Sequence, residues 1–289
     1  MKNPIFTGVC TALVTPFLNN EINYPLVEQL LARQIDAGVR SVVLSGTTGE
    51  SATLTDYEKI MLIQKAKEYV GSDFCVIAGS GSNSTTQAIT LSIEAEKAGA
   101  DALLVVAPYY NKGNADGLYK HYTAIANAVS IPIIIYNVPT RTGVDLSVQL
   151  YAKLCKHPNI VGVKEASSDI RKIGQIRIAC KDNFTIWAGN DDQIVPSIAM
   201  GAKGVISVVS NIYPANTVAM AEAALDGDFD TASEIQCQLM PYIDLLFKEV
   251  NPVPVKYAMK YAGFDCGRCR LPLGELQNDT KEKIDALFI

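Results

Sequence analysis

The chain has 289 residues, 48% of them hydrophobic and 19% charged, which is enough apolar material for one large core and excludes a disordered chain. The formal net charge is -5 and lysine and arginine form no cluster, so neither a nucleic-acid surface nor a polybasic membrane patch is indicated. No apolar stretch has the length of a signal peptide, and none approaches the roughly 20 residues of a membrane span. We expect a cytoplasmic protein that acts on a small molecule.

Eight apolar runs of strand length occur along the chain, with helix-length segments between them. The runs are continuously apolar, which is typical of parallel strands covered on both faces and not of a half-solvated antiparallel sheet. They cover residues 8–14, 41–44, 75–78, 102–107, 131–136, 160–163, 184–188 and 204–209.

The segments between the runs carry helix signals. Thr55 and Glu58 have the spacing of a capping box, and three segments end in a glycine just before the next strand: Gly38, Gly99 and Gly201. This repetition predicts an α/β fold, a (β/α)8 TIM barrel, with an open doubly wound sheet as the rival architecture. Eight such units favour a closed barrel over an open sheet. From about residue 211 the pattern is helical, so we expect a catalytic barrel over residues 1–225 and additional C-terminal helices over 226–289 packed on it.

Active sites of such barrels form at the carboxyl ends of the strands, so the polar residues that close each run are the informative ones. Lys164 closes the sixth run, where burial favours the neutral amine that can attack a carbonyl carbon and form an imine. Tyr136 ends the preceding run and should lie beside Lys164, where its phenol can relay protons. Arg141 offers a forked donor suited to a carboxylate. Each of these residues also has a purely structural interpretation. Lys164 could be a solvated strand end, Tyr136 could serve only in packing, and Arg141 could be a solvated loop residue.

The glycine-rich segment from Gly46 to Gly49 could present N–H groups and hydroxyls to a carboxylate, although a tight turn is the simpler interpretation. No group of His, Cys and Asp residues has metal-ligand spacing, so neither a metal nor a cofactor is expected, and Asp191 and Asp192 are interpreted as helix capping. The seven cysteines are odd in number and irregularly spaced, which does not predict a disulfide framework. Cys266 and Cys269 form an isolated CxxC, interpreted as two free thiols near the surface.

Four motifs resemble those of the dihydrodipicolinate synthase/N-acetylneuraminate lyase family. They are GTTGE from Gly46, PYYN from Pro108, YNVPTRTG from Tyr136 and GVKEAS from Gly162. The resemblance spans essentially the whole chain, including NPVPVK from Asn251 to Lys256. It is greatest for those members that condense pyruvate with L-aspartate 4-semialdehyde on the diaminopimelate route to lysine.

The resemblance implies a proton relay around a Schiff-base lysine. Lys164 would form the imine with pyruvate, and the relay would consist of Tyr136, Thr47 and Tyr110. Because Tyr110 would come from a neighbouring subunit, the resemblance implies a homo-oligomer, with a tetramer built as a dimer of tight dimers as the expected form.

Four further residues would hold the substrates. Thr48 would bind the pyruvate carboxylate, Gly189 and Ile206 would supply main-chain contacts, and Arg141 would bind the carboxylate of aspartate semialdehyde. The alternative within the fold is an aldolase of the N-acetylneuraminate lyase type or one acting on keto-deoxy sugar acids. Such relatives generally lack an arginine at the position of Arg141, because their substrate presents hydroxyls there. A binding protein without turnover is the alternative from another class.

The resemblance also predicts an effector site. Family members that lysine inhibits resemble this chain at Asn83 and Tyr109, but carry glutamate in place of Gln87 and histidines in place of Asp56 and Lys59. A neutral amide binds an ammonium group more weakly than a carboxylate does. We therefore predict that lysine barely inhibits this chain.

Overall fold

The computed structural model describes residues 3–288, and in it eight parallel strands close into a barrel. Each strand pairs in parallel with its neighbours in chain order, and β1 pairs with β10 to complete the ring. The predicted (β/α)8 barrel is therefore confirmed, and every strand lies within two residues of its expected bounds. The strands are β1 (Gly8–Ala12), β4 (Ser41–Leu44), β5 (Cys75–Gly79), β6 (Ala102–Val106), β7 (Ile133–Asn137), β8 (Ile160–Glu165), β9 (Thr185–Ala188) and β10 (Gly204–Ser207).

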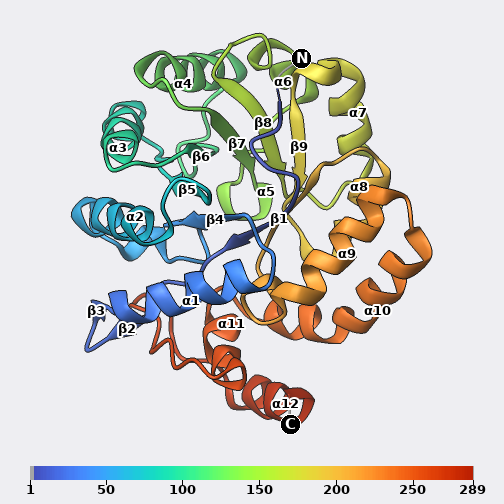
Figure 1. Cartoon of the computed structure of the whole chain (residues 1–289). Helices are drawn as coiled ribbons and strands as arrows, with labels where there is room; N and C mark the ends of the chain where they lie inside the picture. Colours follow the sequence, from blue (N-terminus) through green and yellow to red (C-terminus); the bar gives the residue numbers. More distant parts are fainter. Residues whose placement is uncertain (1–2, 289) are drawn as a thin grey trace.

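Helices surround the barrel on the outside (Figure 1). They are α1 (Tyr24–Asp36), α2 (Asp56–Val70), α3 (Thr85–Lys97), α4 (Ala115–Ala128), α6 (Val148–Leu154), α7 (Arg171–Cys180), α8 (Ile194–Ala199) and α9 (Pro214–Asp226). The capping box of α2 is confirmed, because Thr55 and Glu58 each accept a hydrogen bond from the other's backbone N–H. A hairpin of β2 (Phe17–Leu18) and β3 (Glu21–Ile22) follows β1, and the short helix α5 (Pro139–Thr142) follows β7.

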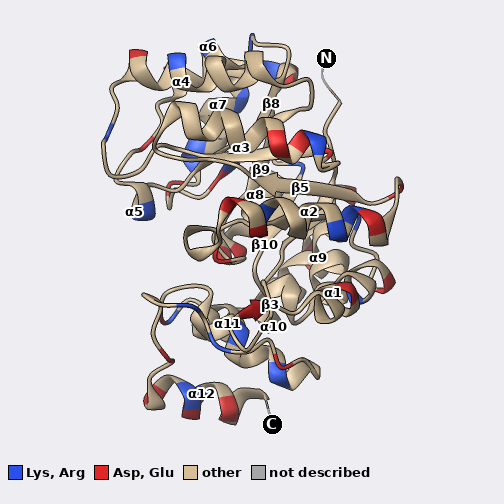
Figure 2. Cartoon of the chain, turned by 90° about the vertical axis from the view of Figure 1, so that its left-hand side faces the viewer, with Lys and Arg blue, Asp and Glu red and all other residues tan. Residues whose placement is uncertain are grey.

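Three more helices follow the last barrel helix: α10 (Phe229–Leu246), α11 (Val253–Ala258) and α12 (Asn278–Phe288). The side chain of Gln236 in α10 donates to the carbonyl of Asp191 at 2.9 Å and accepts from the N–H of Val195 at 3.3 Å, which ties α10 to the strand ends. Figures 1 and 2 both place α12 at the end of the molecule opposite α4 and α6. The C-terminal helices are confirmed, and the division at residue 225 stays a prediction.

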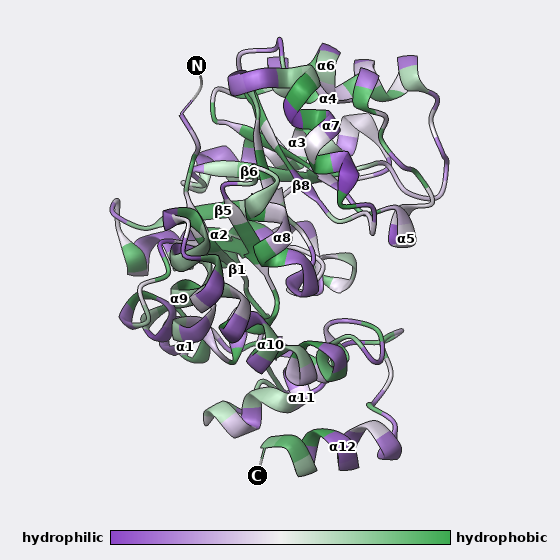
Figure 3. Cartoon of the chain, turned by 90° about the vertical axis from the view of Figure 1, so that its right-hand side faces the viewer, coloured by the Kyte–Doolittle hydropathy of each residue, from purple (hydrophilic) through white to green (hydrophobic). Residues whose placement is uncertain are grey.

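Two apolar cores result from the alternation of side chains along each strand. One lies inside the barrel and the other, larger core lies between the strands and the helices; the apolar colouring of the central strands is seen in Figure 3. Phe6 stacks on Trp187 with ring centroids 4.9 Å apart, and the indole N–H donates to the Phe6 carbonyl at 3.2 Å. This pair fills the barrel interior below the strand ends. None of the helices between residues 3 and 288 is long and apolar enough to cross a membrane.

Candidate active site

Lys164 and Tyr136 lie side by side at the carboxyl ends of β8 and β7. They are register partners in the barrel, and the Lys164 Nζ lies 4.5 Å from the centroid of the Tyr136 ring. Both side chains are buried, with 5% and 7% of their surfaces exposed. Gly162, two residues before Lys164, has no room for a Cβ, which would lie 2.6 Å from the Trp187 ring. Glycine at that position therefore lets Trp187 fill the barrel directly below the lysine.

A cavity of about 210 Å³ opens above this pair. Besides Lys164 and Tyr136, its lining includes five residues from the strand ends and the loops that follow them: Thr47, Thr48, Arg141, Gly189 and Asn190. The structure thus brings six of the eight predicted catalytic and substrate-binding residues to one cavity. Ile206 is fully buried among the side chains of the barrel interior and does not line the cavity.

Tyr110 lies away from the cavity of its own chain. Its side chain is 88% exposed, and its φ of 73° lies in the left-handed region that a tyrosine rarely adopts. The Tyr110 phenol is therefore outside the cavity that Lys164 and Tyr136 line in the same chain.

Part of the cavity lining comes from the segment after α10, for which the sequence predicts no role in the site. Phe247, Glu249, Val250 and Asn251 line the cavity. The Asn251 side-chain amide donates to the Thr48 hydroxyl at 3.0 Å, and the backbone carbonyl of Asn251 accepts from Arg141 Nη2 at the same distance. The only sequence signal was the NPVPVK motif, which the resemblance included without a role.

The loop that carries Thr47 and Thr48 is anchored by a buried ion pair. Glu50 adopts a left-handed backbone conformation with φ 58°, and its carboxylate lies 2.7 Å from the Lys256 Nζ. The other carboxylate oxygen of Glu50 accepts from the backbone N–H of Arg270 at 2.8 Å. Since both charged groups are withdrawn from solvent, this contact fixes the loop against the C-terminal region.

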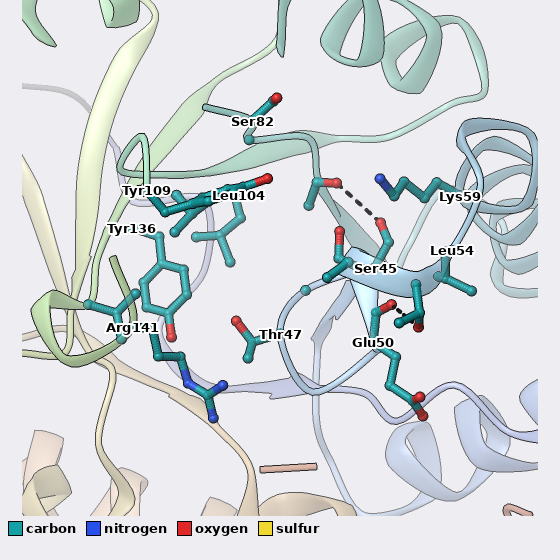
Figure 4. Close-up of a pocket in the computed structure, with 18 of the residues that line it drawn as sticks. Ser45, Thr47, Glu50, Leu54, Lys59, Ser82, Leu104, Tyr109, Tyr136 and Arg141 are labelled. Atoms are coloured by element: carbon teal, nitrogen blue, oxygen red, sulfur yellow. Dashed lines mark hydrogen bonds between the residues drawn. The ribbon is translucent and has the colours of Figure 1, made fainter. Parts of the chain in front are cut away.

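A second cavity, of about 470 Å³, adjoins the first and shares Thr47, Tyr136 and Arg141 with it. Four of the five predicted effector residues line this larger cavity: Asp56, Lys59, Gln87 and Tyr109. Figure 4 shows Tyr136 and Arg141 on one side, with Thr47 next to them, and Lys59 reaching in from the other. Asn83 does not line it, and its carbonyl accepts from the Asn111 side chain at 2.8 Å.

Two expectations for individual residues are wrong. Asp191 does not cap its own helical turn; it accepts from the N–H groups of Val208 and Val209, at 2.9 and 2.7 Å, where the chain leaves β10. Burial raises the pKa of the Asp191 carboxyl, and these bonds oppose the rise. Cys266 is not near the surface but buried, because its segment packs on the β2–β3 hairpin and its carbonyl accepts from Phe17 at 3.0 Å. Cys269 is half-buried, and both thiols are free.

Neither of the two histidines joins the cavity. The Nδ1 of His121 hydrogen-bonds to Thr85 between α3 and α4 at 2.9 Å, and burial lowers the pKa of His121 to about 4. Within residues 3–288, no three His, Cys, Asp or Glu side chains gather in a way that could hold a metal ion. The ionisable side chains that line the smaller cavity are the Lys164 amine, the Tyr136 phenol, the Arg141 guanidinium and the Glu249 carboxylate.

Comparison with known proteins identifies the family. Residues 5–288 match the model of the dihydrodipicolinate synthetase family. The chain belongs to this family. A protein of Exiguobacterium sibiricum named 4-hydroxy-tetrahydrodipicolinate synthase is 48% identical over 270 residues, covering 93% of this chain and 92% of that protein.

Solved structures of the dihydrodipicolinate synthetase family have the same fold. The enzyme of Aquifex aeolicus superposes with a TM-score of 0.96 at 40% identity, covering 98% of this chain and 97% of that chain. Dihydrodipicolinate synthase of Cyanidioschyzon merolae, solved with lysine bound, gives a TM-score of 0.94 at 38% identity, covering 97% of this chain and 96% of that chain. The resemblance seen in the sequence is confirmed, and the relatives favour the synthase over the aldolase alternative.

Proposed function

We propose that this chain catalyses the Schiff-base condensation of pyruvate with L-aspartate 4-semialdehyde, the reaction of a 4-hydroxy-tetrahydrodipicolinate synthase. The observation that carries the proposal is the buried Lys164 amine beside the Tyr136 phenol, in a cavity that also contains Thr47 and Arg141. A buried amine loses less solvation when it is neutral, and the neutral amine is the nucleophile that imine formation needs.

The reaction begins when the Lys164 amine adds to the ketone carbon of pyruvate, and loss of water gives the imine. Removal of a proton from the methyl carbon gives the enamine, which adds to the aldehyde carbon of the second substrate. The amino group of that substrate then attacks the imine carbon, closes the ring and releases Lys164. Each step moves a proton, and Tyr136 and Thr47 lie where hydroxyl groups can carry it. Since amine and hydroxyl chemistry suffices, we expect neither a metal nor a cofactor to take part.

The two substrates present carboxylates that need separate partners. We assign the pyruvate carboxylate to Thr48, with main-chain contacts from Gly189 and Ile206, and the carboxylate of the semialdehyde to Arg141. A guanidinium offers two parallel N–H donors to a carboxylate, and Arg141 reaches both cavities. The Arg141 side chain is already held by the Asn251 carbonyl, which keeps the donors oriented before the substrate binds.

The third relay residue, Tyr110, is assigned to the site of a second copy of the chain, within a homotetramer built from tight dimers. Its 88% exposure and its left-handed backbone support this assignment. The protein would act in the cytoplasm, with residues 1–225 as the catalytic barrel and 226–289 as a helical region packed on it. The larger cavity is proposed as an effector site formed by Asn83, Gln87, Tyr109, Asp56 and Lys59.

The test is covalent trapping. Incubation with pyruvate and borohydride should leave a reduced adduct on Lys164 alone. Lys172 and Lys256 are the internal controls, because both are as buried as Lys164 but form ion pairs with carboxylates. An adduct on another lysine, or loss of activity when a chelator is added, would contradict the proposed mechanism. Turnover of pyruvate with aspartate semialdehyde, set against cleavage of N-acetylneuraminate, then separates the synthase from the aldolase.

A further inference from the structure

A cluster of polar side chains fills the helix layer directly behind the reactive lysine. Its members, which we call the strand-end brace, come from β7, β8, α6, α7 and the loop before α6: Asn137, Asp145, Tyr151, Glu165 and Lys172. All but Asp145 are buried. The condensation consumes none of these groups, so their burial in the apolar layer calls for another explanation.

Asn137 has each of its amide atoms engaged. Its Nδ2 donates to Glu165 Oε1 at 2.8 Å and to Asp145 Oδ1 at 2.9 Å, and its Oδ1 accepts from the N–H of Leu146 at 3.1 Å. Because no other side chain offers two donors and an acceptor in this shape, only an asparagine joins the two carboxylates to the backbone here.

Glu165 is satisfied just as fully. Its Oε1 also accepts from the N–H of Ser167 at 2.8 Å, while its Oε2 accepts from the Tyr151 hydroxyl at 3.2 Å and lies 3.8 Å from the Lys172 Nζ. Burial, together with the Glu165 carboxylate, raises the pKa of the Tyr151 phenol, which therefore stays a donor. Lys172 also pairs with Asp145, so one cation lies between two carboxylates. A buried charge with this many partners is held in one place.

The brace acts on the same strand ends that carry the reactive pair. Asn137 and Glu165 directly follow Tyr136 and Lys164, and the two residues of each pair are register partners. The backbone N–H of Ala166 donates to the Asn137 backbone carbonyl at 2.9 Å. The N–H of Gly189 donates to the Glu165 backbone carbonyl at 2.7 Å. Since alternate side chains of a strand point to opposite faces, locking one residue outside the barrel sets the direction of its neighbour inside.

We infer that Glu165 and Asn137 are positioning residues, which hold the ends of β7 and β8 so that the Lys164 amine and the Tyr136 phenol stay in reacting geometry. This inference rests on the proposed function. A displacement of about 1 Å in a reacting group can lower a rate about 100-fold, so a partial loosening of the strand ends should cost at least about tenfold in kcat.

The experiment compares two carboxylate-to-amide changes. Glu165→Gln keeps the shape of the brace but places an NH2 donor where the carboxylate accepted hydrogen bonds, so that donors face one another. Asp101→Asn makes the same change in a network at the amino ends of the strands. There, the Asp101 carboxylate accepts from Lys67 and from the N–H of Val76, both at 2.7 Å. Glu165→Gln should lower kcat about tenfold or more and leave the KM for pyruvate within about threefold, while Asp101→Asn keeps both near the wild-type values.

Equal losses of kcat in the two variants, or a kcat of Glu165→Gln within about threefold of wild type, overturn the inference. Where Glu165→Gln does not fold, Tyr151→Phe decides, because it removes a single donor from Glu165; an unchanged kcat in that variant also overturns the inference. Borohydride trapping separates this outcome from a failure of the proposed function. If wild-type protein gives no adduct on Lys164, the proposed function is refuted. If wild-type protein gives the adduct and Glu165→Gln has a kcat close to that of wild type, only the positioning role of Glu165 and Asn137 is refuted.

Discussion

Removing one partner of the buried Glu50–Lys256 ion pair should be among the most destabilising single changes near the active site. Its two side chains are 0% and 2% exposed, and the charged atoms are 2.7 Å apart. Replacing Lys256 by methionine preserves the apolar stem, but leaves the carboxylate buried with the Arg270 N–H as a remaining donor. Breaking a buried pair in this way costs about 3 to 5 kcal/mol, and the remaining bond places the expected loss near the lower end. That is a large fraction of the roughly 5 to 15 kcal/mol that stabilises a typical domain.

Urea unfolding at fixed protein concentration measures the effect. The double variant Glu50→Gln with Lys256→Met should recover much of the lost stability, because it removes the stranded charge. Lys283→Met is the matched control: Lys283 forms an exposed pair with Asp279, and such pairs contribute about 1 kcal/mol or less. If Lys256→Met unfolds within about 1 kcal/mol of wild type, the carboxylate is not confined to a dry site and the reasoning is wrong.

Two further predictions concern the cavities. Arg141→Ala should impair the use of aspartate semialdehyde more than the formation of the pyruvate imine, with a loss of about 1.5 to 3 kcal/mol for a charged hydrogen bond. An equal loss in both steps would instead make Arg141 structural, through its bond to Asn251. Millimolar lysine should barely lower the initial rate, because Gln87 offers an amide in place of a carboxylate and Lys59 adds a like charge. Strong, saturable inhibition across a lysine titration would contradict this prediction and point to Asp56 as the substitute charge.

The fold could be predicted because its signals are local. Each strand of the barrel is a continuous apolar run, since both of its faces are covered, and the glycines Gly38, Gly99 and Gly201 all adopt the left-handed backbone expected where a helix stops. The neighbourhood of Lys164 and Tyr136 follows from the same pattern, because consecutive parallel strands of a barrel are adjacent.

The parts of the site that escaped prediction are held by contacts between distant segments. Glu50 and Lys256 are 206 residues apart, and Asn251 meets Thr48 across 203 residues. Nothing in the spacing of either segment indicates that the chain after α10 returns to cover the mouth of the barrel. Asp191 was misinterpreted for a related reason: its position at a helix start suggested a local cap, but its hydrogen-bond partners belong to the next strand end.

Lys164 and Glu165 are adjacent in sequence, but their side chains do not form an ion pair because they lie on opposite faces of β8. A carboxylate beside the amine would hold it as an ammonium ion, which cannot attack a ketone. Strand periodicity keeps the two groups apart, because Lys164 points into the barrel while Glu165 points into the helix layer, where Asn137, Tyr151 and Lys172 satisfy it. The backbone of β8 thus separates the Glu165 carboxylate from the amine that we propose as the nucleophile. A charged residue can therefore directly follow Lys164 in sequence without forming an ion pair with its amine.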